Sequence, residues 1–129
     1  MIENNFLPVF VAGIVTKGRQ IGRTLAYPTA NIIPLNGVMP NIPYGVYAGW
    51  TIFEKNRYAS IMSFGKAETV GAKDIALETH LLDYEGDLYG KELKVEVTLF
   101  LRNMTKFNSL EELKVAMEQD ENRARKLLE

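Results

Sequence analysis

The chain has 129 residues, of which 47% are hydrophobic and 24% are charged, a composition that indicates one globular domain over residues 1–129. It contains no cysteine, which excludes disulfides and thiolate metal sites. The most apolar N-terminal stretch, Phe6 to Val15, is about half of the roughly 20 residues that span a bilayer, and no basic region precedes it. We therefore expect no signal peptide and no membrane partner, and the cytoplasm is the expected location.

The net charge of −1 conceals an uneven distribution of charge. Residues 1–66 carry six Lys or Arg and two acids, whereas residues 67–129 carry nine and fourteen. Lys17, Arg19 and Arg23 lie in a stretch without acids, which suits an anion, although three solvated basic side chains would look the same. The basic residues are too few, and too rarely accompanied by aromatic residues, to favour nucleic acid as a partner.

Alternating or continuous apolar patterns predict a series of strands in chain order. The last of them is the clearest, because five apolar residues alternate with Lys, Glu and Thr in the pattern of a half-buried antiparallel strand. That alternation places the side chains of Leu93, Val95, Val97, Leu99 and Leu101 on one face. The five predicted segments are Val9 to Val15, Gly45 to Ile52, Tyr58 to Phe64, Ile75 to Leu82 and Leu93 to Leu101.

One helix is expected after these strands. Ser109 and Glu112 have the spacing of a capping box, in which each side chain satisfies the other's backbone N–H. An apolar stripe follows at helical spacing, interrupted by Asp120 and Arg123; its members are Leu110, Leu113, Met117, Ala124 and Leu127. Five or six strands followed by one helix predict a mainly β fold, a closed antiparallel barrel with a C-terminal helix packed on it.

Three glycines, Gly13, Gly18 and Gly22, are candidates for a phosphate-binding backbone. Their spacing matches neither the Walker pattern nor the dinucleotide fingerprint. Glycines that bring backbone N–H groups close to an anion need not precede a helix, so a phosphate cradle stays open. The alternative is an ordinary turn at a strand end.

The sequence Pro28-Thr29-Ala30-Asn31 is a second candidate. Pro28 restricts its own φ, and in an extended chain Thr29 and Asn31 project from one face. A hydroxyl and an amide oxygen are hard ligands that suit Mg²⁺. A turn stabilised by bonds from side chain to backbone is the alternative interpretation.

A third candidate lies in the strand predicted over Ile75 to Leu82. Glu78 and His80, the only histidine, would share one face of it. A carboxylate there can serve as a general base, whereas two residues at this spacing do not make a metal site. Arg102 and the segment 103–107, which includes Met104 and Phe107, form either a rim of the site or a plain surface loop.

Four stretches of this sequence together resemble the riboflavin kinases, the flavokinase family that also forms the C-terminal module of bacterial bifunctional FAD synthetases. They cover almost the whole chain in the family's order. Most specific are the PTAN motif and the ETH motif with the Asp and Tyr-Gly after it. The stretches are "GIVTKGRQIGRTLAYPTANI", "GVYAGW", "ETHLLDYEGDLYGKELKVEV" and "LRNMTKFNSLEELKVAMEQDENRAR".

The resemblance implies a six-stranded antiparallel barrel with a C-terminal helix, and transfer of the γ-phosphate of ATP to riboflavin, giving FMN and ADP, with Mg²⁺, or Zn²⁺ in some members. It implies that Thr29 and Asn31 hold metal and phosphate and that Glu78 is the base for the ribityl 5′-hydroxyl. It further implies flavin contacts from Arg102, Met104 and Phe107. The nucleotide-binding residues that it implies are Gly13, Lys17, Gly18, Gly22, Arg23, Pro28, Thr29 and Asn31.

Three positions depart from the family pattern: Ala26 replaces a common Gly, Glu68 replaces a Pro, and Met104 replaces a frequent Glu. These departures motivate the alternative of a regulatory protein that binds flavin or nucleotide on the same barrel with little turnover. A small RNA-binding barrel is a weaker alternative, because the C-terminal half is acidic. The family's adenylyltransferase domain does not fit within the 129 residues, so we expect no FAD synthesis, and a monomer is the default.

Overall fold

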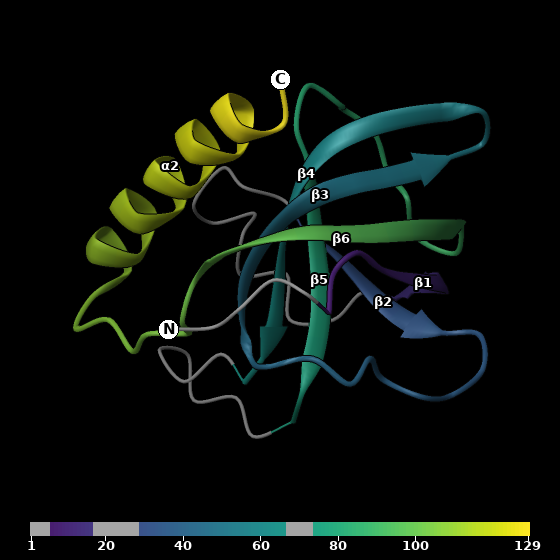
Figure 1. Cartoon of the computed structure of the whole chain (residues 1–129), viewed down its shortest axis with the longest axis horizontal. Coiled ribbons are helices and arrows are strands. Elements are labelled where there is room, and N and C mark those ends of the chain that lie inside the picture. The colour runs from purple at the N-terminus through teal and green to yellow at the C-terminus, as the bar shows by residue number, and fades with distance from the viewer. Residues whose placement is uncertain (1–5, 17–28, 67–73) are drawn as a thin grey trace.

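In the part of the chain that the computed structural model describes, residues 6–16, 29–66 and 74–129, six strands form a closed barrel in the order β1-β2-β5-β4-β3-β6. All neighbouring strands are antiparallel. One helix, α2, packs along one side of the barrel against β4 (Figure 1). The expected architecture is confirmed. Its elements are β1 (Val9–Thr16), β2 (Ala30–Pro34), β3 (Gly45–Phe53), β4 (Asn56–Gly65), β5 (Ala76–Leu81), β6 (Glu92–Arg102) and α2 (Leu110–Leu127).

The interior of the barrel is filled by every second residue of its strands. Ile32 on β2 pairs with Leu77 on β5, which pairs with Phe64 on β4, and all three are at most 3% exposed. Because side chains alternate along a strand, the residues next to them in the sequence face outward. The polar motifs of β2 and β5 therefore lie on the outer face of the barrel.

Three hydroxyl groups are also buried, and they hydrogen-bond to one another. Thr51 Oγ1 lies 2.8 Å from Ser60 Oγ and 2.9 Å from Thr79 Oγ1, and all three residues are fully buried. Ser60 also donates to the carbonyl of Tyr58 at 2.9 Å. Mutual pairing offsets the cost of removing these groups from water.

Strand β6 does not keep the simple alternation that its sequence predicts. Its pairing with β3 shifts register twice, between the partners of Val46 and Tyr47 and again between those of Ala48 and Gly49. Each shift inserts one extra residue into β6, and a β-bulge of this kind reverses which face the following side chains take. Leu93, Val95 and Val97 fill the barrel as expected. The expectation for Leu99 and Leu101 is wrong, because both pack instead in the cluster beneath α2.

Helix α2 has only part of the cap and of the apolar stripe that its sequence predicts. Ser109 caps it as expected, accepting from the N–H of Glu112 at 3.2 Å. The Glu112 carboxylate accepts from Asn108 at 3.1 Å rather than from Ser109, so only half of the expected capping box is present. The expected apolar stripe is wrong at both ends, since Leu110 and Leu127 are 41% and 50% exposed.

Candidate active site

One row of outward-facing side chains crosses four strands of the barrel. Thr16 on β1 pairs with Asn31 on β2, Asn31 with Glu78 on β5, and Glu78 with Ser63 on β4. Residues directly opposite each other in an antiparallel pair share a face, with Cβ atoms about 4.5–5.5 Å apart. Candidates separated by 47 positions in the sequence, Asn31 and Glu78, are therefore neighbours in space.

Glu78 lies at the centre of this row and is 8% exposed. The hydroxyl of Thr29, just before β2, donates to Glu78 Oε2 at 3.1 Å. This hydrogen bond orients the carboxylate, and the carboxylate can still accept a further hydrogen bond. A largely buried, oriented carboxylate can receive a proton from a hydroxyl bound within hydrogen-bond reach.

Asn31 is oriented from the opposite side of the row. Its amide nitrogen donates to Thr16 Oγ1 at 2.8 Å, which leaves the amide oxygen as the atom that can coordinate a cation. Thr29 and Asn31 thus place two neutral oxygens beside Glu78. No group of three or more His, Cys, Asp or Glu that could hold a metal occurs within the described residues, so these oxygens suit a cation that takes its other ligands from water and phosphate.

Gly13 lies inside β1, in the strand predicted over Val9 to Val15. It pairs with Pro34 of β2 and with Leu93 of β6. A Cβ at this position would come within 2.5 Å of Ile32 Cγ2 and of the Ile33 carbonyl oxygen. Close packing of β1 against β2 is therefore enough to explain why residue 13 is a glycine. The other nucleotide-binding candidates, Lys17, Gly18, Gly22, Arg23 and Pro28, lie outside the described residues, as do Ala26 and Glu68.

Of the three flavin-binding candidates, Arg102 is the last residue of β6, and Met104 and Phe107 follow it in the segment 103–107. Arg102 pairs with Val46, which pairs with Ser63, so it belongs to the same row as Glu78. Three interstrand spacings separate them, about 14 Å along the curved sheet. The guanidinium of Arg102 lies over the ring of Phe107, with Cζ 5.6 Å from its centroid.

A small pocket borders the segment after β6. Its volume is about 100 Å³, and Tyr44, Lys66, Met104 and Thr105 line it. Met104 and Tyr44 both line the pocket, and the Tyr44 ring packs edge-on against Phe64, with the ring centroids 5.5 Å apart. An aromatic ring and a thioether suit one face of a planar apolar ligand.

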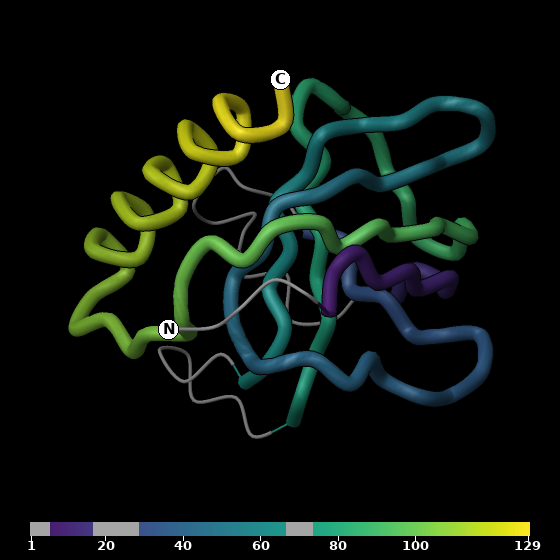
Figure 2. Tube along the Cα trace, in the orientation of Figure 1, coloured from purple at the N-terminus to yellow at the C-terminus, as the bar shows by residue number. Residues whose placement is uncertain are grey.

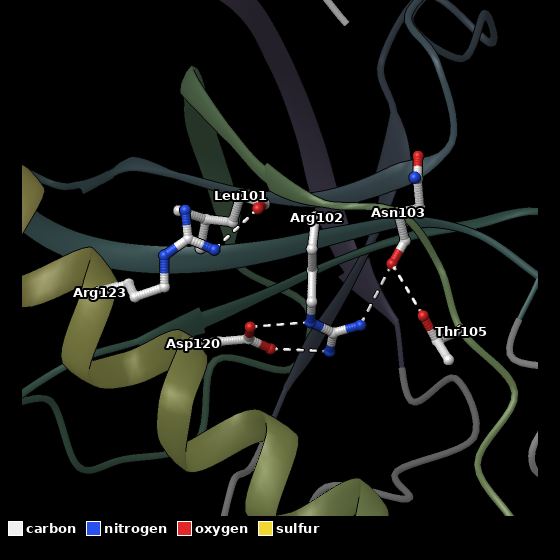
Figure 3. Close-up of polar contacts among 6 residues, drawn as sticks. All are labelled: Leu101, Arg102, Asn103, Thr105, Asp120 and Arg123. Atoms are coloured by element: carbon white, nitrogen blue, oxygen red, sulfur yellow. Dashed lines mark hydrogen bonds and ion pairs between the residues drawn. The ribbon is translucent and has the colours of Figure 1, made fainter. Parts of the chain in front are cut away.

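Sequence reasoning did not identify Thr16, Tyr44 and Asp120 as part of this region. Thr16, at the end of β1, is located by its pairing with Asn31, and Tyr44, just before β3, by the pocket that it lines. Asp120 had a signal in the sequence, because it interrupts an apolar stripe. It is 3% exposed, and its carboxylate accepts two hydrogen bonds from Arg102 (Figure 3).

The model of the riboflavin kinase family, Flavokinase, matches residues 6–128. The chain belongs to the riboflavin kinase family. The expected resemblance is thereby confirmed. Among the helices of the described residues, none is long and apolar enough to cross a membrane.

Similar proteins agree with this membership of the riboflavin kinase family. The chain is 36% identical over 92% of its length to the bifunctional riboflavin kinase/FMN adenylyltransferase of Escherichia coli K12. It is 32% identical over 85% of its length to the RNA-binding riboflavin kinase RibR of Bacillus subtilis. It spans 37% and 47% of these two relatives. The crystal structure of riboflavin kinase from Trypanosoma brucei is similar with a TM-score of 0.68 at 26% identity, over 96% of this chain and 82% of that one.

Proposed function

We propose that this domain is a riboflavin kinase that transfers the γ-phosphate of ATP to the ribityl 5′-hydroxyl of riboflavin. The observation that carries the proposal is the position of Glu78, a largely buried carboxylate with Thr29 and Asn31 beside it, in a chain of this family. The phosphate end of the reaction lies at these three residues. The flavin ring lies toward Met104 and Phe107, at the other end of the row.

In the proposed step, Glu78 accepts the proton of the 5′-hydroxyl as that oxygen bonds to the γ-phosphorus. The bond from phosphorus to the bridging β–γ oxygen breaks, and ADP leaves with the electron pair. Phosphoryl transfer needs little covalent participation by the protein, and most of the catalysis comes from alignment and from stabilising charge. The hydrogen bond from Thr29 supports this alignment because it holds the carboxylate in one orientation.

Thr29 Oγ1 and Asn31 Oδ1 would hold a divalent cation, and their hard oxygens favour Mg²⁺ over Zn²⁺. When bound, the ion neutralises negative charge on the phosphates of ATP. The protein's own contribution is to present the two oxygens on one face. The hydrogen bond from the Asn31 amide to Thr16 fixes which atom of that amide points toward the ion.

The charge-neutral substitution Glu78→Gln tests this assignment. Glutamine keeps the shape of the side chain and can still accept from Thr29, but it cannot take the proton. We expect kcat to fall by about 10²-fold or more, which is typical for loss of a general base. The measurement is FMN formation from riboflavin, ATP and MgCl₂, followed by chromatography.

Glu92→Gln is the matched control, because Glu92 is an exposed carboxylate of β6, outside this row. It should turn over as the wild type does. Near-wild-type turnover of a folded Glu78→Gln protein would remove Glu78 from the role of base. If the wild type binds riboflavin tightly but forms no FMN, the regulatory alternative is supported instead.

The proposed partners are riboflavin, FMN, ATP and ADP, handled by a monomer in the cytoplasm. The balance of charges counts against a nucleic-acid partner, because residues 67–129 carry five more acids than bases. Light scattering of the purified protein measures its mass in solution. A mobility shift with single-stranded RNA at physiological salt would contradict the absence of a nucleic-acid partner.

A further inference from the structure

Asp120 is a buried acid on the inner side of α2, and it contacts Arg102 at the far end of the row from Glu78. Its side chain is 5% exposed. Both carboxylate oxygens accept from Arg102, Oδ1 from Nε and Oδ2 from Nη2, each at 2.8 Å (Figure 3). Two parallel hydrogen bonds between guanidinium and carboxylate fix orientation as well as distance. The pair therefore determines where the Arg102 side chain lies.

The remaining contacts of Arg102 reach the segment 103–107, which connects β6 to α2. Nη1 donates to the Asn103 carbonyl at 3.3 Å, and the same carbonyl accepts from Thr105 Oγ1 at 3.4 Å. At the other end of the segment, the ring of Phe107 lies beneath the guanidinium. One side chain thus contacts the beginning and the end of the segment that carries Met104.

A second contact holds the same part of α2 on β6. Arg123, one turn after Asp120, donates from Nη1 to the Leu101 carbonyl at 2.8 Å. Figure 3 shows the side chains of Asp120 and Arg123 extending from α2 to the end of β6. The position of α2 and the position of residues 101–103 are therefore linked.

We propose that Asp120 is a positioning residue for the flavin end of the site. By fixing Arg102, it holds the segment 103–107 so that Met104 and Phe107 are presented to the flavin ring. The inference rests on the proposed function, because it assigns the flavin to this segment. A buried carboxylate that loses its partner is strongly unfavourable, so the pair and the ordered segment form together.

The variant Asp120→Asn tests this, because it removes the charge and one acceptor while keeping the shape. We expect the KM for riboflavin and the Kd from flavin fluorescence quenching to rise by about tenfold or more, as loss of a charge-assisted hydrogen bond implies. The KM for ATP and kcat should stay within about twofold, because Glu78 and Asn31 lie on other strands. Asp120→Glu, which keeps the charge, should recover part of the flavin affinity.

Asp83→Asn is the matched control. It makes the same chemical change in another ion pair between α2 and the rest of the fold, Asp83 with Arg125 at 2.9 Å, away from the segment 103–107. It should leave riboflavin binding unchanged. An equal loss of riboflavin affinity in the control, or an equal rise in the KM for ATP in Asp120→Asn, would mean that Asp120 only stabilises the fold and would overturn the proposal.

A second variant covers the case in which Asp120→Asn does not fold. Arg102→Gln combined with Asp120→Asn removes both charges together, so that no unpaired charge remains buried. We expect this protein to fold and to bind riboflavin weakly. Wild-type riboflavin affinity in either folded variant overturns the positioning role. By contrast, a wild type that neither binds nor phosphorylates riboflavin would overturn the proposed function itself.

Discussion

Gly13 shows how one residue can be explained by packing as well as by ligand binding. A Cβ there would meet Ile32 and the Ile33 backbone at 2.5 Å, which is closer than such contacts allow. We expect Gly13→Ala to lower the free energy of unfolding by about 1–3 kcal/mol, as overpacking of a core does. Thermal unfolding measures this loss.

Kinetics of the folded Gly13→Ala protein distinguish the two roles of the glycine. If packing is the whole reason, the KM for ATP stays within about twofold of the wild-type value. A large rise in that KM with an unchanged Tm would show instead that Gly13 approaches the nucleotide. Ala12→Ser, which adds one atom at the exposed neighbouring position, is the control and should change neither quantity.

At single positions, the sequence shows which chemistry a side chain can perform, but it does not show which residues that side chain contacts. Thr29, Asn31 and Glu78 could be selected because a hydroxyl, an amide and a carboxylate have recognisable uses. Their contacts could not be selected in this way. The Thr29 hydroxyl contacts Glu78, which lies 49 positions later in the chain. In the sequence Asp120 only interrupts an apolar stripe, and its role is visible only from its contact with Arg102.

Strand β6 is the element in which sequence pattern and structure diverge. Its sequence alternates apolar and polar residues from Leu93 to Thr98, and the apolar run Leu99-Phe100-Leu101 that follows does not by itself locate a bulge. The reason for it lies in the partner strand and in α2. After the register shifts, β6 supplies Val97 to the barrel interior and Leu101 to the cluster beneath α2. Strand β6 therefore contributes both to the barrel interior and to the cluster beneath α2, and Figure 2 shows it crossing the barrel toward the connection that leads to α2.

This division predicts different effects for two truncations on β6. Leu101→Ala should destabilise by about 2–5 kcal/mol, the usual cost of such a core truncation, and should raise hydrogen exchange chiefly in α2. Val97→Ala should raise exchange chiefly in the barrel strands, because Val97 lies inside the barrel. Native-state hydrogen exchange resolved by segment measures both. Identical exchange patterns in the two variants would contradict the division.

The arrangement of the whole molecule depends on strand order, which local patterns do not encode. Apolar alternation predicted five strands, and the resemblance implied a sixth. The candidate site exists because β2 pairs directly with β5, although β3 and β4 lie between them in the sequence. The pairing of β5 with β4, of β4 with β3 and of β3 with β6 then brings Arg102 onto the same row as Glu78. The fold class was therefore predictable from apolar periodicity, whereas the neighbours within the site were not.

The contact of α2 with Asp83, two residues after the end of β5, predicts that the stability of the molecule depends on pH. Hydrogen bonds from Arg125 hold the pKa of Asp83 below its ordinary value of 3.8. Because the folded pKa is depressed, the stabilisation is present above the pKa of the unfolded chain and is lost as the pH falls through the folded value. We expect Asp83→Asn to have a lower Tm than the wild type at pH 7, with the difference vanishing at pH 2. Added salt should reduce the Tm difference at pH 7, because the ion pair is exposed. A Tm difference that does not change with pH would show that it does not arise from the charge of Asp83.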